Sequence, residues 1–301
     1  MFMKSWAHIC RLQEDNKAKE FPLLPEDLTP CLDRTVINLP SGFEQEMMEL
    51  LFYLSKNIDN LRNLRPPPNS EISPDVVHAT FELTAENIEK LRERVNTHSS
   101  RSLLQLHLST FVIAYAYAWT CLVKSRGGNP NRLVIFLYAA DFRYRLDPKV
   151  PATYFGNCVF PIGWFEYEAR TFSEEDGFVN AVEILSDSVK GLGSRRIESL
   201  WKDYLEGSSK IKSATQFGSV AGSTRLGVYG LDFGWGRPAK TEVLSIDRSE
   251  GFSMSERRDE PGGVEMGLCL KKIMTDPVVG PGSTMNRTYD WIGFPVWFKN
   301  N

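Results

Sequence analysis

The sequence predicts a mixed α/β fold, in which helices flank a sheet of parallel and antiparallel strands. Three observations support this class: strands and helices alternate between residues 76 and 140, further strands cluster late in the chain, and an apolar helical segment lies at 111–123. The chain has 301 residues, enough for one large domain or two ordinary ones. Its composition, 42% hydrophobic and 24% charged, is typical of a globular protein.

The first 75 residues predict two helices separated by an irregular connection. Residues 1–12 interleave charged and apolar side chains at helical spacing, whereas 14–42 carry four prolines and little periodicity. Apolar residues from Phe43 to Leu54 fall on one helical face, and the three prolines at 66–68 favour a stiff extended stretch. We expect a domain boundary near 66–75.

The pattern becomes clearer from Val76 onward. Residues 76–83 favour a strand, and Thr84 is a suitable N-cap for the helix that follows. A second helix is predicted over 103–124, ended by Gly127 and Gly128. The remaining predicted elements are strands at 132–140, 158–164, 226–231, 241–247 and 264–271, and helices at 174–190 and 195–206.

Composition also excludes several functions. The net charge of −3 and the lack of like-charge blocks argue against nucleic-acid binding, and the longest apolar segment is too short to cross a bilayer. Five widely spaced cysteines without a C-x-x-C motif fit reduced thiols in the cytosol. The four histidines have no metal-ligand spacing. We therefore expect a cytoplasmic protein that binds no metal, nucleic acid or membrane.

A glycine cluster over 230–236 carries the most specific signal. It precedes a strand-like run rather than a helix, which argues against a dinucleotide fingerprint. Instead it resembles the D-F-G-W-G signature of the plant BAHD acyl-CoA-dependent acyltransferases. The residues of this motif are Asp232, Phe233, Gly234, Trp235 and Gly236.

A second motif is similar to the Y-F-G-N-C element of the BAHD branch that acts on anthocyanins and phenolic glucosides. It lies in the expected order, after Asp141 and Arg143 and before the first motif. The resemblance covers roughly residues 1–275. The residues of this second motif are Tyr154, Phe155, Gly156, Asn157 and Cys158.

The resemblance implies a fold, an activity and a division of the chain. The fold would be the chloramphenicol acetyltransferase-like C-terminal domain of a two-domain BAHD enzyme, and family members are usually monomeric. The activity would be transfer of an acyl group from acyl-CoA, with malonyl-CoA as the expected co-substrate, to a phenolic or flavonoid glucoside. The implied division is a remnant N-terminal helix over 1–13, a crossover or linker over 14–75, an acyltransferase-like domain over 76–275 and an atypical tail over 276–301.

The family's catalytic motif, H-x-x-x-D, is missing from this sequence. Its histidine removes the proton of the acceptor hydroxyl, but here His8, His78, His98 and His107 all lack an aspartate four positions later. The chain is expected to begin just after the place of that motif, so no residue is assigned a catalytic role. An alternative is therefore a catalytically incomplete fragment or pseudoenzyme, whose surviving domain would expose a large apolar patch.

Three residues are candidates for supporting roles. Asp232 resembles a structural residue that pairs with an arginine. Trp235 lies in a loop that borders the family's substrate channel and, like Arg225, is a candidate contact for the acyl group, the acceptor or CoA. Arg225 resembles a position that meets acyl or acceptor groups, and a guanidinium suits a malonyl carboxylate. A solvated surface arginine is the alternative interpretation of Arg225.

Overall fold

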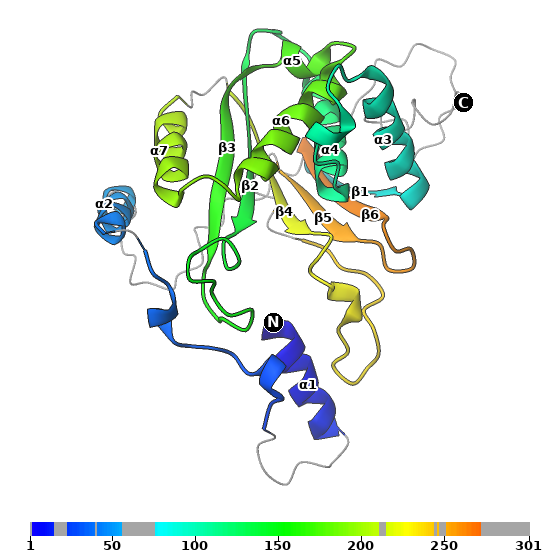
Figure 1. The fold of residues 1–301 in the computed structure, drawn as a ribbon. Coiled ribbons are helices and arrows are strands. Elements are labelled where there is room, and N and C mark those ends of the chain that lie inside the picture. Colours follow the sequence, from blue (N-terminus) through cyan, green and yellow to red (C-terminus); the bar gives the residue numbers. More distant parts are fainter. Residues whose placement is uncertain are drawn as a thin grey trace.

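The central feature is a six-stranded mixed sheet with the strand order β1-β6-β5-β4-β2-β3 (Figure 1). The computed structural model describes residues 2–14, 23–39, 41–55, 76–210, 215–243, 246 and 251–271. The predicted mixed α/β class is confirmed. The strands are β1 (Val76–Leu83), β2 (Leu133–Asp141), β3 (Val159–Glu168), β4 (Gln216–Ser223), β5 (Phe252–Glu256) and β6 (Val264–Lys271).

Strand direction changes across the sheet. β1 and β5 each pair antiparallel with β6, and β3 pairs antiparallel with β2. β4 lies between β2 and β5 and runs parallel to both. The carboxyl ends of β2, β4 and β5 therefore meet at one end of the sheet, where the connections that follow them lie together.

Helices cover one face of the sheet and pack against its edge. α4 contacts α3, α5, α6 and β4, while α7 contacts the edge strand β3. α4 is apolar on all sides and most of its side chains are buried, as expected for a helix enclosed by other elements. The helices are α1 (Phe2–Glu14), α2 (Phe43–Ser55), α3 (Ala85–His98), α4 (Thr110–Arg126), α5 (Arg170–Ser173), α6 (Gly177–Gly191) and α7 (Ile197–Ser208).

Aromatic side chains fill the space between α4 and the sheet. The Trp119 ring lies 4.6 Å from the ring of Phe136 on β2 and 6.3 Å from that of Phe172. Gly218 on β4 makes room for the indole, because a Cβ at that position would lie 2.3 Å from an indole carbon of Trp119. The lack of a side chain at Gly218 therefore fixes how closely α4 approaches the sheet.

Local capping signals are confirmed where the sequence predicts them. Thr84 Oγ1 accepts a hydrogen bond from the backbone N–H of Asn87, and Asn87 Oδ1 accepts one from that of Thr84, each at 3.0 Å. This capping box fixes the start of α3. Gly127, at a φ of 54°, ends α4.

Two predicted elements differ from the structure. The helix expected from residue 103 begins at Thr110, because the preceding segment bonds elsewhere: the backbone N–H of His107 donates to Ser186 Oγ on α6 at 2.7 Å. The strand expected at 226–231 is wrong, since residues 228–230 form a 3-10 turn and β4 ends before them.

Other expectations fall partly or wholly outside the described residues. Residues 241–243 form no strand, and most of the rest of the run to 247 lies outside the described residues, as do the prolines at 66–68 and the tail from 276. No described helix is long and apolar enough to cross a membrane. Within the described part of the chain, no three His, Cys, Asp or Glu residues gather as metal ligands would.

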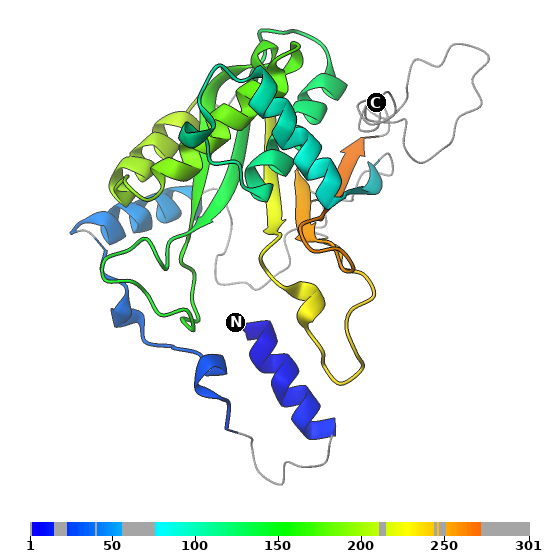
Figure 2. The same cartoon turned by 45° about the vertical axis from the view of Figure 1, so that its right-hand side comes forward.

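α1 lies beyond the end of the sheet rather than in the helical layer (Figures 1 and 2). The β4–β5 connection, drawn in yellow, extends from the sheet in the same direction. Ser5 Oγ on α1 donates to the backbone carbonyl of Leu28 at 2.7 Å, in the segment that follows the helix. Both recognised motifs lie at this end of the molecule.

Candidate functional site

The candidate site is built at the carboxyl ends of β2 and β4. These strands are parallel neighbours, so the β2–β3 loop and the β4–β5 connection leave the sheet side by side. The first carries residues 154–158 and the second carries 232–236. Ligands of open α/β sheets bind at the carboxyl ends of parallel strands, where loops can vary without disturbing the core.

The segment 154–158 is held against the N-terminal part of the chain. The backbone N–H of Phe155 donates to the carbonyl of Cys31 at 2.9 Å, and the Arg34 guanidinium donates to the carbonyl of Phe155 while lying 5.2 Å from the centre of the Tyr154 ring. A Cβ at Gly156 would lie 2.5 Å from Arg34 Nη1 and 2.6 Å from the Tyr154 hydroxyl oxygen, so a side chain there would displace these contacts. Tyr154 is buried, whereas Phe155 remains 43% exposed.

Asp232 organises the turn that bears its own motif. Its Oδ1 accepts hydrogen bonds from the backbone N–H groups of Gly234 at 2.8 Å and Gly236 at 2.9 Å. These bonds stabilise the carboxylate and lower the pKa of Asp232 below its ordinary value. Both glycines have positive φ, 112° and 90°, which other residues adopt at a cost.

No arginine forms an ion pair with Asp232 among the described residues. The described structure gives this carboxylate backbone partners only, while Arg11 and Arg237 lower its pKa through smaller charge effects. The turn leaves Trp235 with 87% of its surface exposed, a side chain presented for contact rather than buried.

α1 connects the two motifs through a chain of aromatic rings. The ring of Phe2 lies 5.4 Å from that of Phe155, and the ring of Trp6 lies 5.3 Å from that of Phe233. Phe2 and Trp6 are themselves 5.9 Å apart. Each of these distances falls within the range of favourable aromatic pairs. The helix therefore spans the two loops, a role that helical periodicity alone does not reveal.

Charged side chains at this end include one tight pair. Arg143 donates to both carboxylate oxygens of Asp141, with Nη2 2.7 Å from Oδ2. Burial raises the pKa of Asp141, but the hydrogen bonds and charge of Arg143 outweigh it, so the pKa lies below its ordinary value. Arg145 donates to the backbone carbonyl of Asp141. These contacts order the start of the β2–β3 loop.

Arg225 lies at the start of the β4–β5 connection and is exposed. Its backbone N–H donates to Ser223 Oγ at 3.2 Å, and its guanidinium has no partner among the described residues. Arg225 is therefore available to an anionic ligand. The structure does not bring its guanidinium into contact with Asp232 or Trp235.

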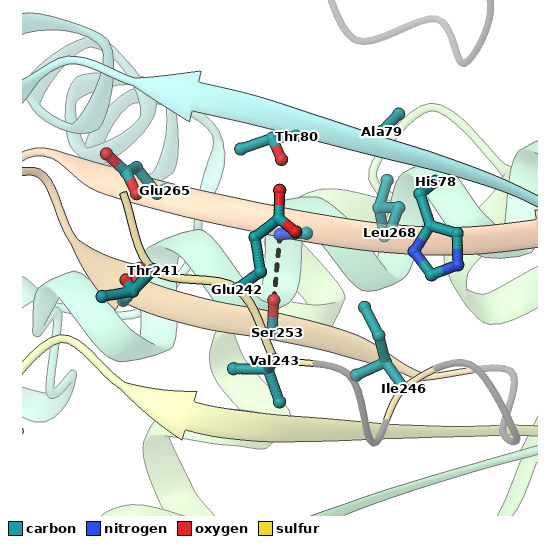
Figure 3. A pocket seen from close by; sticks show the side chains of 12 residues that line it. His78, Ala79, Thr80, Thr241, Glu242, Val243, Ile246, Ser253, Glu265 and Leu268 are labelled. Carbon is teal, nitrogen blue, oxygen red and sulfur yellow. Dashed lines mark hydrogen bonds between the residues drawn. The ribbon is translucent and has the colours of Figure 1, made fainter. Parts of the chain in front are cut away.

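A cavity near this site was not predicted from the sequence. About 250 Å³ in volume, it is lined by residues of β1, β5 and β6 and by Thr241, Glu242 and Val243 of the β4–β5 connection (Figure 3). His78, which sequence analysis treats as an ordinary strand residue, faces it. The signal available in the sequence is the alternation of polar and apolar residues along the three strands.

Comparison with known proteins identifies the family. A model of the Transferase family matches residues 1–276. A BAHD acyltransferase of Arabidopsis thaliana is 56% identical over 90% of this chain and 58% of its own length, and phenolic glucoside malonyltransferase 2 of the same plant is 52% identical over 92% and 59%.

A solved structure agrees with the fold. Vinorine synthase superposes with a TM-score of 0.57 at 18% identity, covering 91% of this chain and 55% of that one. This chain thus spans less than two thirds of the length of these relatives. The family match, the close identity and the two motif-bearing loops agree, and the chain belongs to the Transferase family that includes the BAHD acyltransferases.

Proposed function

We propose that this chain is part of an acyl-CoA-dependent O-acyltransferase that transfers a malonyl group to a sugar hydroxyl of a phenolic or flavonoid glucoside. The carrying observation is that the two motif-bearing loops, joined by α1, lie at the carboxyl ends of parallel strands. The 52% identity to a phenolic glucoside malonyltransferase supports the choice of donor and acceptor. Further parts of the proposal are an acyltransferase-like domain over 76–275 and a cytosolic location.

In the proposed reaction, the acceptor oxygen attacks the thioester carbonyl carbon. A C–O bond forms, the C–S bond breaks, the hydroxyl proton passes to a base, and the CoA sulfur leaves as a thiolate that takes up a proton. A positioned base raises the rate by a factor of about 10² to 10⁴. Hydrogen-bond donors must also stabilise the oxyanion that forms on the thioester oxygen. Arg225 is proposed to pair with the malonyl carboxylate, and Trp235 to border the bound substrates.

A second candidate function is a catalytically incomplete fragment or pseudoenzyme that binds its ligands without turnover. It is favoured by one observation, the lack of H-x-x-x-D in this sequence. The two functions share their binding residues and differ in the removal of the hydroxyl proton. Measurement of both binding and turnover therefore distinguishes them.

The test is incubation of the purified chain with malonyl-CoA and a phenolic glucoside, following CoA release and malonylated product. Acyl transfer above background supports the transferase, whereas malonyl-CoA binding without product supports the pseudoenzyme.

Arg225→Ala is expected to weaken malonyl-CoA binding more than acetyl-CoA binding, because acetyl lacks the carboxylate. Arg258→Ala, an exposed arginine between β5 and β6, is the control. If malonyl-CoA and acetyl-CoA each bind Arg225→Ala as tightly as they bind the wild type, the proposed role of Arg225 is overturned.

A further inference from the structure

The cavity lies on the face of the sheet opposite the helices (Figure 3). On β5, Ser253 and Ser255 line it, while Phe252 and Met254 belong to the hydrophobic core on the other face. β6 alternates in the same way, with Glu265 facing the cavity. Three adjacent strands thus place polar side chains on one surface, and the segment from Thr241 to Val243 forms a wall above it.

One end of the cavity offers both donors and acceptors. Ser253 Oγ accepts the backbone N–H of Gly267 at 3.2 Å, which leaves its hydroxyl proton to donate. Glu265 Oε2 accepts the Tyr229 hydroxyl at 2.7 Å, and the backbone N–H of Thr241 lies 3.3 Å from the same Tyr229 oxygen. Tyr229 thereby ties the wall of the cavity to its floor. Figure 3 shows the Glu242 carboxylate reaching toward Thr80 across this end.

The other end is apolar. Ile246 lies there, beside the imidazole of His78 (Figure 3), whereas the side chain of Leu268, opposite Phe252, belongs to the core on the other face. The volume of about 250 Å³ is below the range of about 300–1,000 Å³ typical of sites for drug-sized molecules. The cavity therefore suits a ligand of one ring, with polar groups on one side and a C–H surface on the other.

We propose that this cavity binds a neutral ring that bears several hydroxyl groups, as a sugar does. Hydroxyls both donate and accept, and so match the Thr80 and Ser253 hydroxyls together with the Glu242 and Glu265 carboxylates. Both carboxylates already have partners, because Glu242 pairs with Lys240 and Glu265 accepts the Tyr229 hydroxyl. A neutral ligand that both donates and accepts therefore matches this lining better than an anion or an ammonium group does. In naming the sugar of the acceptor, the inference rests on the proposed function.

The position of the cavity agrees with such a role. Thr241 and Glu242 belong to the same β4–β5 connection as Asp232 and Arg225. The hydrogen bonds of Tyr229 hold that connection against β6, so a sugar in the cavity would contact the segment that carries the D-F-G-W-G motif. Occupation of the cavity is thereby expected to order residues that also belong to the motif loop.

The test uses the full chain and ligand-detected NMR titration with methyl β-D-glucopyranoside. Thr80→Val and Glu242→Gln keep the shape of the side chain and remove a hydroxyl or a charge at exposed positions. Each is expected to weaken binding about tenfold, the loss of one hydrogen bond to a charged or polar group. Glu49→Gln, on the exposed surface of α2, is the matched control and should bind as wild type does.

Three outcomes would overturn the inference. The first is that tetrahydropyran, a ring without hydroxyls, binds as tightly as the glucoside, and the second is that glucoside affinity is unchanged in both cavity variants. The third is that the cation agmatine or the anion malonate binds more tightly than the glucoside. Malonyl-CoA binding is measured separately on the same samples. Glucoside binding without malonyl-CoA binding would leave the cavity assignment intact while contradicting the proposed function. Malonyl-CoA turnover with unaltered glucoside affinity in the variants would contradict the cavity assignment alone.

Discussion

At the scale of single residues, a glycine that has no side chain allows the core of this protein to pack closely. Gly218 faces the indole of Trp119, and an added Cβ would lie 2.3 Å from it. We expect Gly218→Ala to destabilise the fold by about 1–3 kcal/mol, the usual cost of overpacking a close-packed core. Urea unfolding measures this. Gly230→Ala is the matched control, because no atom lies within 4 Å of its added Cβ, and an equal loss in both variants would contradict the argument.

Asp232 provides a pH-dependent prediction. Its pKa is lowered in the folded chain, so its contribution to the turn is present above the pKa of the unfolded state and is lost as the pH falls through the folded pKa. We expect hydrogen exchange at the Gly234 and Gly236 amides, corrected for intrinsic rates, to become less protected on acidification. Asp232→Ala should remove this protection severalfold at neutral pH, whereas Asp259→Ala at the exposed β5–β6 turn should not. Unchanged protection in Asp232→Ala would show that the turn does not depend on the carboxylate.

At the scale of elements, α1 should depend on its aromatic contacts for its position. Trp6→Ala removes the contacts with Phe2 and Phe233, and aromatic pairs of this kind contribute about 0.5–1.5 kcal/mol each. We expect faster amide exchange in α1 and in the turn after Asp232, with α3 unchanged. Lys4→Ala, an exposed position on the same helix, is the control. Equal exchange in Trp6→Ala and wild type would mean that other contacts hold the helix.

Local signals predict elements well only where neighbouring residues decide the structure. Thr84 and Gly127 mark helix ends through bonds to their own sequence neighbours, and both are confirmed. β4 escapes prediction because it contains Gly218 and Gly222, residues unfavourable in isolated strands, and is stabilised by parallel pairing with β2 and β5 far along the chain. Its glycines serve close packing, which no local pattern records.

The candidate site likewise has some features that the sequence predicts and others that it does not. The D-F-G-W-G turn can be anticipated because Asp232 bonds to residues two and four positions away. The contact of Arg34 with Phe155, and the meeting of Phe2 and Trp6 with the two loops, join residues more than 100 positions apart. The cavity likewise requires β1 to pair with β6 at the far end of the chain. These features are set by topology and not by spacing.

At the scale of the whole molecule, large apolar side chains gather at the end that carries the motifs. They come from α1, the segment after it, the β2–β3 loop and the β4–β5 connection, which Figures 1 and 2 place together beyond the end of the sheet. An exposed apolar surface of this kind favours association in water. The exposed side chains are Phe2, Met3, Trp6, Leu23, Leu32, Tyr144, Phe155, Leu226 and Trp235.

We therefore expect the purified chain to self-associate as its concentration rises, although members of the family are expected to be monomers. Sedimentation velocity should show a concentration-dependent increase in sedimentation coefficient, which Trp235→Glu and Leu226→Glu together reduce by placing charges on this surface. Leu104→Glu is the matched control, because Leu104 is 96% exposed but lies in the turn before α4. A monomer at all concentrations, or equal suppression by Leu104→Glu, would contradict association through the motif-bearing end. Reduced association with unchanged malonyl-CoA binding would also contradict the proposed contact of Trp235 with the bound substrates.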